Sequence, residues 1–135
     1  MAGITLKKGT VISESGQPFT AIHLITSGKV TASYPGGIYQ LSKGDVIGVC
    51  EVCSEINFLT YTAAEDTTIH TYPFTNIATL DDLLHKKSDI AKLFILSAFS
   101  QLNILLEACS ISELNCNSFY QFLQEDIAKY NRICN

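Results

Sequence analysis

Turn residues divide the first 73 residues into short segments about ten residues apart, and this spacing limits the fold more than any other feature of the sequence. The segments alternate apolar and polar residues, as in AIHLITSGKVTASY, which indicates strands with one buried face. We expect strands at residues 4–6, 11–13, 21–27, 29–33, 38–41, 45–47, 58–63 and 67–72. Many short strands with regular turns predict a mainly β fold, a jelly-roll (double-stranded β-helix) sandwich.

After residue 74 the apolar period changes from two residues to about 3.6, which indicates α-helices. We predict a short helix over 75–87 and a long helix over 88–109 that Ser88 caps. A third helix over 118–134 opens with Ser118 and Gln121 in capping-box spacing. The expected organisation is one domain, with a β core at 1–74 and a helical extension of two or three helices at 75–135.

The long helix is apolar on most of its circumference, which indicates burial on most sides. Apolar residues recur along it at alternating steps of four and three, the pattern of a coiled-coil seam. The seam residues are Ile95, Phe99, Leu102, Leu106 and Cys109. We therefore predict a homodimer through Ile95, Phe99, Leu102 and Leu106; in the alternative, the third helix folds back over this seam within one monomer.

Charge and hydropathy exclude several classes of partner. The net charge is −4 and the chain has only nine lysine and arginine residues, whereas phosphate contacts need clustered positive charge, so direct nucleic-acid binding is not expected. No run reaches the roughly 18 apolar residues of a membrane span, and MAGITLKKGT lacks the apolar core of a signal peptide. We expect a cytoplasmic protein without membrane contact, whose five cysteines are mostly buried apolar side chains.

Residues 6–90 resemble the cyclic nucleotide-binding domain of the Crp/Fnr regulators. Glycines in register with alternating apolar residues carry the resemblance in LKKGTVISESGQP, AIHLITSGKV, YQLSKGDVIG, TAAEDTTIHTYP and LDDLLHKKSDIA. It implies a jelly roll followed by a short helix and a long dimerisation helix. It also implies a non-catalytic sensor domain of a bacterial signalling or transcription regulator, either free-standing or a fragment of a longer regulator.

The resemblance further implies a phosphate-binding cassette after the strand at 45–47. The positions expected at the ligand are Gly48, Val49, Cys50, Glu51, Ser54, Asn57, Phe58 and Leu59. Val49 stands where the family has a glutamate for the ribose hydroxyl. Asn57 stands near the family's arginine, which pairs with the phosphate. Both charged contacts are therefore missing.

A cassette of this composition does not support ordinary cAMP binding. Neutral donors leave much of the desolvation cost of a phosphate anion uncompensated, and Glu51 and Glu55 would repel the anion. In one alternative the pocket is retuned to a less anionic small molecule, with Asn57, Ser54 and the Gly48 backbone as hydrogen-bonding groups. In the other, the cassette is closed and the domain is a ligand-free structural dimerisation module. No cofactor is predicted, and either a cAMP-like nucleotide or another small molecule is left open as the ligand.

The CEVC stretch from Cys50 to Cys53 raises a thiol or metal sensor as a further alternative. A structural zinc ion needs two more ligands, and no second CxxC pair occurs. His23, His70 and His85 are isolated, unlike the paired histidines of metal-binding cupins, and we expect His23 and His70 to face solvent or make one structural hydrogen bond. We predict no metal site and no enzyme activity, because no catalytic constellation stands out.

Overall fold

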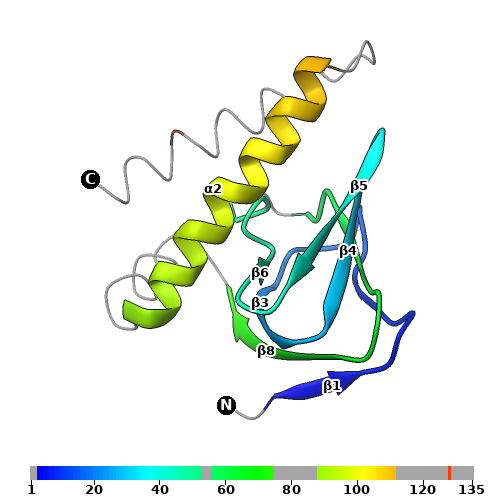
Figure 1. Ribbon diagram of the computed structural model, residues 1–135, viewed down its shortest axis with the longest axis vertical. Helices are drawn as coiled ribbons and strands as arrows, with labels where there is room; N and C mark the ends of the chain where they lie inside the picture. The colour runs from blue at the N-terminus through cyan, green and yellow to red at the C-terminus, as the bar shows by residue number, and fades with distance from the viewer. Residues whose placement is uncertain (1–2, 53–55, 75–87, 112–127, 129–135) are drawn as a thin grey trace.

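The computed structural model describes residues 3–52, 56–74, 88–111 and 128. These residues form two four-stranded antiparallel sheets with a long helix beside them (Figure 1). The first sheet has the order β1 (Ile4–Leu6), β8 (Thr67–Pro73), β3 (Ala21–Ser27), β6 (Val46–Ile47). The second has the order β2 (Val11–Ser13), β7 (Thr60–Ala63), β4 (Lys29–Tyr34), β5 (Gly37–Ser42). The predicted β sandwich followed by helices is confirmed.

The helix α2 (Ser88–Ile111) corresponds to the predicted long helix and extends two residues further. The predicted helices at 75–87 and 118–134 fall, apart from residue 128, outside the described residues. The division into a β core at 1–74 and a helical extension at 75–135 stays a prediction. In the described part of the chain, no helix is both long and apolar enough to cross a membrane.

Every predicted strand is present, and most boundaries agree within one residue. The exception is β7, which begins at Thr60 rather than at residue 58. The residues before it pair with a different segment, the loop between β2 and β3. Asn57 accepts a hydrogen bond from Gly16 N and donates its own N–H to Gln17 O, both at 2.8 Å. The chain therefore pairs with the loop between β2 and β3 at Asn57 and joins the second sheet only at Thr60.

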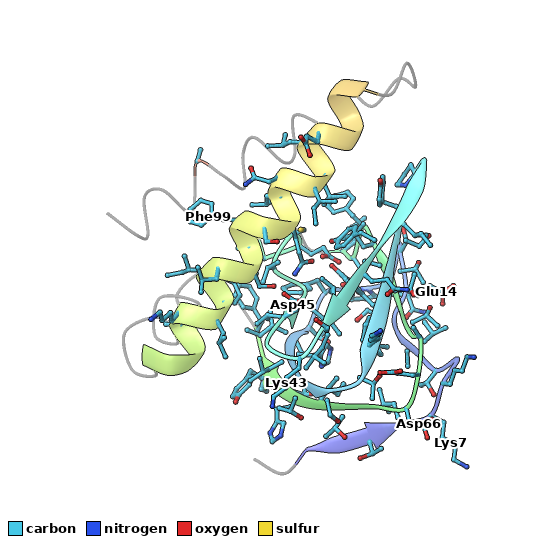
Figure 2. All side chains as sticks on the ribbon, viewed as in Figure 1. Lys7, Glu14, Lys43, Asp45, Asp66 and Phe99 are labelled. Carbon is cyan, nitrogen blue, oxygen red and sulfur yellow. The ribbon has the colours of Figure 1, made fainter. Side chains whose placement is uncertain are left out.

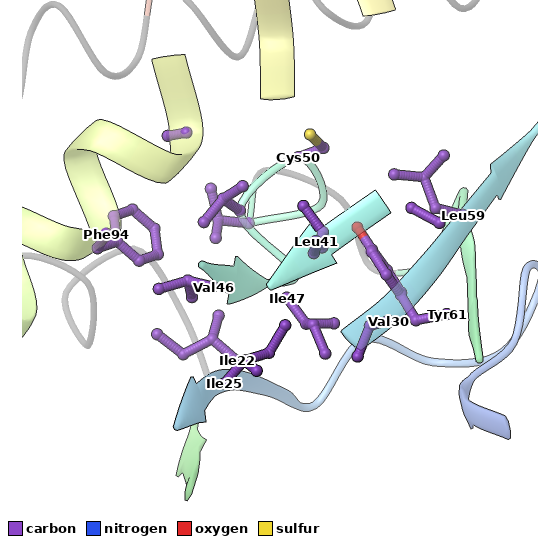
Figure 3. Packing of buried hydrophobic residues seen from close by; sticks show 14 of the residues in the cluster. Ile22, Ile25, Val30, Leu41, Val46, Ile47, Cys50, Leu59, Tyr61 and Phe94 are labelled. Atoms are coloured by element: carbon purple, nitrogen blue, oxygen red, sulfur yellow. The ribbon is translucent and has the colours of Figure 1, made fainter. Parts of the chain in front are cut away.

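The core lies between the two sheets and continues between the first sheet and α2. Ile25 and Ile69 are cross-strand partners in the first sheet, and both are buried. Val30 and Tyr61 lie in the second sheet and are fully buried (Figure 3). On α2, four side chains belong to the same cluster: Phe94, Ala98, Leu102 and Leu105. The helix therefore adds four side chains to the core beside β6, the edge strand of the first sheet.

His23 illustrates how a polar side chain is accommodated in the first sheet. It pairs in register with Thr71 of β8, and its Nδ1 atom lies 2.8 Å from Thr71 Oγ1. Burial lowers the pKa of His23 to about 4, because the charged imidazolium loses its hydration. The prediction of a single structural hydrogen bond is confirmed for this residue.

We expect His23 to make stability depend on pH. A base whose pKa is lower in the folded state stabilises the fold fully above its unfolded pKa of 6.5 and progressively less as the pH falls toward about 4. Between pH 7 and pH 5 the free energy of unfolding should fall by about 2 kcal/mol through this residue. Urea unfolding at both pH values measures the fall. His23→Gln should reduce it by that amount; an equal fall in the wild type and His23→Gln would contradict the assignment.

Candidate ligand-binding cassette

The cassette begins at Gly48, directly after the edge strand β6. Gly48 has a φ of +100°, a conformation that side-chain-bearing residues rarely adopt. A Cβ atom there would lie 3.0 Å from Phe19 Cε1 and 3.3 Å from Ala21 O. The turn that follows is held by a hydrogen bond of 3.1 Å from Glu51 N to Gly48 O. The space beside the Gly48 Cα is bordered by the protein's own Phe19 and Ala21.

The four residues after Gly48 point into the protein. Val49 and Glu51 are completely inaccessible to solvent, and Cys50 and Val52 are almost so. Val49, expected at the family's glutamate position, is therefore a core residue. Leu59, at the far end of the cassette, is also inaccessible, whereas Phe58 is half-buried. Ser54 falls outside the described residues.

Glu51 places a carboxyl group in the interior. Its Oε1 accepts a hydrogen bond of 2.7 Å from the hydroxyl of Tyr61, which lies on β7 in the opposite sheet, and both side chains are fully buried. The pKa of Tyr61 is raised well above its usual value, first by burial and then by the charge of Glu51. This contact joins the cassette to the second sheet.

Tyr39 of β5 extends these contacts to the helix. Its hydroxyl donates a hydrogen bond of 2.8 Å to Oε1 of Gln101 on α2. The pKa of Tyr39 is raised far above its usual value by burial, by the charges of Cys50 and Glu51, and by a hydrogen bond with Cys50. Tyr39 therefore contacts the cassette and α2 at once.

Gln101 and Ser97, one turn apart on α2, bind the backbone of Val46 in β6. Val46 N donates to Ser97 Oγ at 3.0 Å, and Gln101 Nε2 donates to Val46 O at 2.8 Å. Gln101 Nε2 also donates to Ser97 Oγ at 2.7 Å. We call Glu51, Tyr61, Tyr39, Gln101 and Ser97 the buried polar network. It runs from the cassette, through the interior, to the helix.

Sequence reasoning did not identify Tyr39, Tyr61, Ser97 or Gln101. The tyrosines were hidden because each is one aromatic position in an ordinary alternating strand. Ser97 and Gln101 did leave a signal, since they form a polar pair four residues apart on the apolar side of the helix, away from its polar strip. A polar pair in that setting indicates a buried hydrogen-bonded contact.

Asn57, expected near the position of the family's arginine, faces the loop between β2 and β3. Its side-chain Nδ2 lies 3.2 Å from both Gln17 O and Pro18 O and donates to these two carbonyl groups. The side chain is 7% exposed. The two protons of the amide are therefore directed at backbone carbonyls rather than at a ligand.

The predicted seam residues of α2 separate into two groups. Leu102 is buried against the sandwich within one protomer. Ile95 and Leu106 are half-buried, and Phe99 is 39% exposed and points away from the sheets (Figure 2). Two further apolar residues of the helix, Leu96 and Ile104, are exposed as well. The structure thus leaves Ile95, Phe99 and Leu106 along the edge of the helix next to its buried face.

The described residues give little support to the alternative of a thiol or metal sensor. Cys50 is a buried cysteine that is in no disulfide, and Cys53 falls outside the described part of the chain. Among the described residues, no three His, Cys, Asp or Glu side chains are grouped as metal ligands.

Comparisons with known proteins identify the fold. No protein-family model and no curated protein matches the sequence. A transcriptional regulator from Thermotoga maritima matches the structure with a TM-score of 0.58 at 17% identity, over 78% of this chain and 86% of the regulator. A cAMP-binding acyltransferase from Mycobacterium smegmatis gives 0.54 at 21% identity, over 68% of this chain and 31% of the acyltransferase. The regulatory subunit of a cAMP-independent protein kinase A from Trypanosoma brucei gives 0.52 at 16% identity, over 66% of this chain and 38% of the subunit.

The chain has the fold of the cyclic nucleotide-binding domains, as its sequence resemblance implied. It spans less than a third of the acyltransferase and less than half of the kinase subunit. One of these proteins is described as cAMP-binding and another as cAMP-independent. The fold therefore does not decide the ligand, and the residues of the cassette must be considered themselves.

Restoring the family's glutamate in the cassette should destabilise this protein. Val49→Glu places a charge at a position with no solvent access, and we expect the free energy of unfolding to fall by roughly 3 to 5 kcal/mol. Val11→Glu is the matched control, because Val11 is 52% exposed; its effect should stay within about 1 kcal/mol. Urea unfolding measures both variants. If the free energy of unfolding falls by the same small amount in both variants, the Val49 position is open to water.

Proposed function

We propose that this protein is a non-catalytic regulatory module of the Crp/Fnr type whose cassette is closed by its own side chains. It serves signalling or transcription regulation through the position of its long helix and does not bind cAMP in the usual way. The hydrogen bond between Tyr61 and Glu51 carries the proposal, since it brings the cassette inward and fills the sandwich interior beside it.

Electrostatics support the exclusion of a cyclic phosphate. Among the described residues, Glu51 is the buried acidic side chain, and every lysine is exposed. A phosphate entering beside Glu51 would lose its hydration and meet a carboxylate rather than a guanidinium group. Asn57 offers no compensation, because its amide protons are directed at Gln17 O and Pro18 O.

A cassette retuned to a neutral small molecule is the second candidate. Tyr39, Tyr61 and Cys50 would offer such a molecule hydroxyl and thiol groups near Glu51. Binding would require the cassette to open, because these side chains are buried against one another. Their mutual hydrogen bonds favour the closed, ligand-free module over this candidate.

The module is further proposed to be a homodimer through α2. Ile95, Phe99 and Leu106 form a partly exposed apolar stripe next to the buried face of the helix, and Leu106 also packs against the core of its own protomer. A side chain of this size forfeits about 1.5 to 3 kcal/mol when it stays fully in water, and the half-buried members forfeit less. A second copy of the stripe would cover these side chains in coiled-coil fashion. Leu102, predicted at the centre of the seam, would instead support it from within the protomer.

Calorimetry tests the closed cassette. We expect cAMP and cGMP to bind with dissociation constants weaker than roughly 100 μM, because no cationic group among the described residues is positioned for the phosphate. Adenosine, which lacks the phosphate, is the comparison ligand. No binding of any of the three supports the closed cassette, binding of adenosine alone supports the retuned pocket, and low-micromolar binding of cAMP would contradict both.

Light scattering tests the dimer. Phe99→Glu places a charge in the proposed interface, so the folded protein should have half the mass of the wild type. Leu96→Glu is the control: Leu96 is 59% exposed on the same helix but lies off the stripe, and the variant should keep the mass of the dimer. A wild type that is monomeric at high micromolar concentration would contradict the proposal.

A further inference from the structure

The edge strands of the two described sheets differ in how well they are protected against pairing with another chain. Proteins protect a sheet edge by a short strand, by a bulge or by covering the edge. β1 has three residues, and β2 has three with a register shift. β6 has two, and Ser97 and Gln101 of α2 bind the backbone of Val46. β5 has six residues and pairs with β4 in an uninterrupted register, so it is the least protected of these edges (Figure 1).

The backbone groups of Ile38 and Gln40 face the open side of β5. Tyr34 and Gly37 flank a two-residue turn and are therefore a hydrogen-bonded pair, and such pairs alternate with non-bonded pairs along an antiparallel ladder. Ile38 and Gln40 fall at the non-bonded positions, so their N–H and C=O groups are directed away from β4. In the described part of the chain, no residue outside β4 bonds the backbone of Ile38 or Gln40.

Solvent reaches this part of the edge. Ile38 is 65% exposed, and Gln40 is exposed as well. Ser42, the next residue of the same series, is already satisfied: its N–H donates to Asp45 Oδ2 at 2.9 Å, and its carbonyl accepts Asp45 N at 3.0 Å. The open segment is therefore residues 38–40. The strand GIYQLS contains neither the charged residues nor the proline with which edge strands often block pairing.

We infer that residues 38–40 are a pairing site for β5 of a second copy of this chain. A two-fold antiparallel pair centred on Tyr39 places Ile38 of each copy opposite the partner's Gln40. In this register the free N–H and C=O groups of both residues are bonded in both copies, through four hydrogen bonds. The register also keeps Ile38 and Gln40 on the exposed face of the joined sheet and Tyr39 on the buried face.

Charge favours a second copy as the occupant of this edge. The chain has a net charge of −4, so two copies repel one another over most of their surfaces, and β5 offers a contact that carries no charge. Four hydrogen bonds along a three-residue segment bury far less than the roughly 800 Å² per partner of a stable interface. The contact is therefore transient and leaves the mass of a dimer through α2 unchanged.

This pairing goes beyond the proposed function, because it uses neither the stripe on α2 nor an opening of the cassette. A chain that dimerises through α2 and pairs through β5 has two separate two-fold contacts, and its dimers can associate further where their local concentration is high.

Disulfide trapping tests the pairing, because it captures a transient contact. Directly paired residues have Cα atoms about 5.5 Å apart, within the range that a disulfide spans. Ile38→Cys protein is mixed with Gln40→Cys protein and oxidised with diamide, and the linked peptides are identified by mass spectrometry. The mixture should give at least roughly tenfold more linked dimer than either variant alone, since residue 38 lies opposite the partner's residue 40 and two positions away from the partner's residue 38.

A mixture of Ser33→Cys and Gln40→Cys is the matched control. Ser33 is exposed and lies beside Ile38 on the inner strand β4, so this mixture should give no more linked dimer than a single variant. The trapping is repeated with Phe99→Glu in both proteins, where the link between residues 38 and 40 should persist. Equal yields in the test and control mixtures would overturn the pairing, and so would a link that disappears with Phe99→Glu.

Discussion

A carboxyl group inside an apolar sandwich is stable only where hydrogen-bond donors meet it, and Glu51 is such a group. Tyr61 supplies a donor from the opposite sheet, at 2.7 Å. To reach it, the turn after Gly48 has to fold inward, and Val49 and Cys50 are carried into the core with Glu51. The interior beside the cassette is consequently filled by protein atoms. One hydrogen bond thus links the inward course of this turn to the opposite sheet, and the proposed exclusion of a phosphate depends on it.

The need to pair buried polar groups with hydrogen-bond partners also determines where the helix lies. The outer edge of β6 exposes a backbone donor and acceptor that must be bonded, and α2 satisfies both with Ser97 and Gln101. Phe94 then packs close to Val46, where Figure 3 shows both side chains. The face of α2 that is left over includes Phe99, which points away from the sheets. Polar contacts therefore fix the orientation of a helix that is almost entirely apolar, and this orientation sets the surface available to a partner.

Alternation and turn residues were sufficient to predict the strands, because these patterns reflect local geometry and burial on one face. The start of β7 was predicted two residues early, since the pairing of Asn57 with Gln17 depends on a loop about 40 residues away, which no local pattern reveals. The residue types at Val49 and Asn57, expected at the family's glutamate and near its arginine, were visible in the sequence, as was the acidity of the cassette. The contact between Glu51 and Tyr61 was not, because it joins the cassette to a strand of the opposite sheet. Helical periodicity likewise placed Leu102 in the seam, although in the structure it packs into the core of its own protomer.

Comparing Tyr61→Phe with Tyr34→Phe in urea unfolding tests the closed cassette most directly. Both variants remove one hydroxyl group, from the fully buried Tyr61 and from the half-buried Tyr34. If the cassette is closed, Tyr61→Phe leaves Glu51 without that donor in a dry interior, and the free energy of unfolding should fall by about 1 to 3 kcal/mol. Tyr34→Phe should change it by less than about 0.5 kcal/mol. An equally small effect at Tyr61 would mean that water replaces the lost hydroxyl group, and would contradict the account.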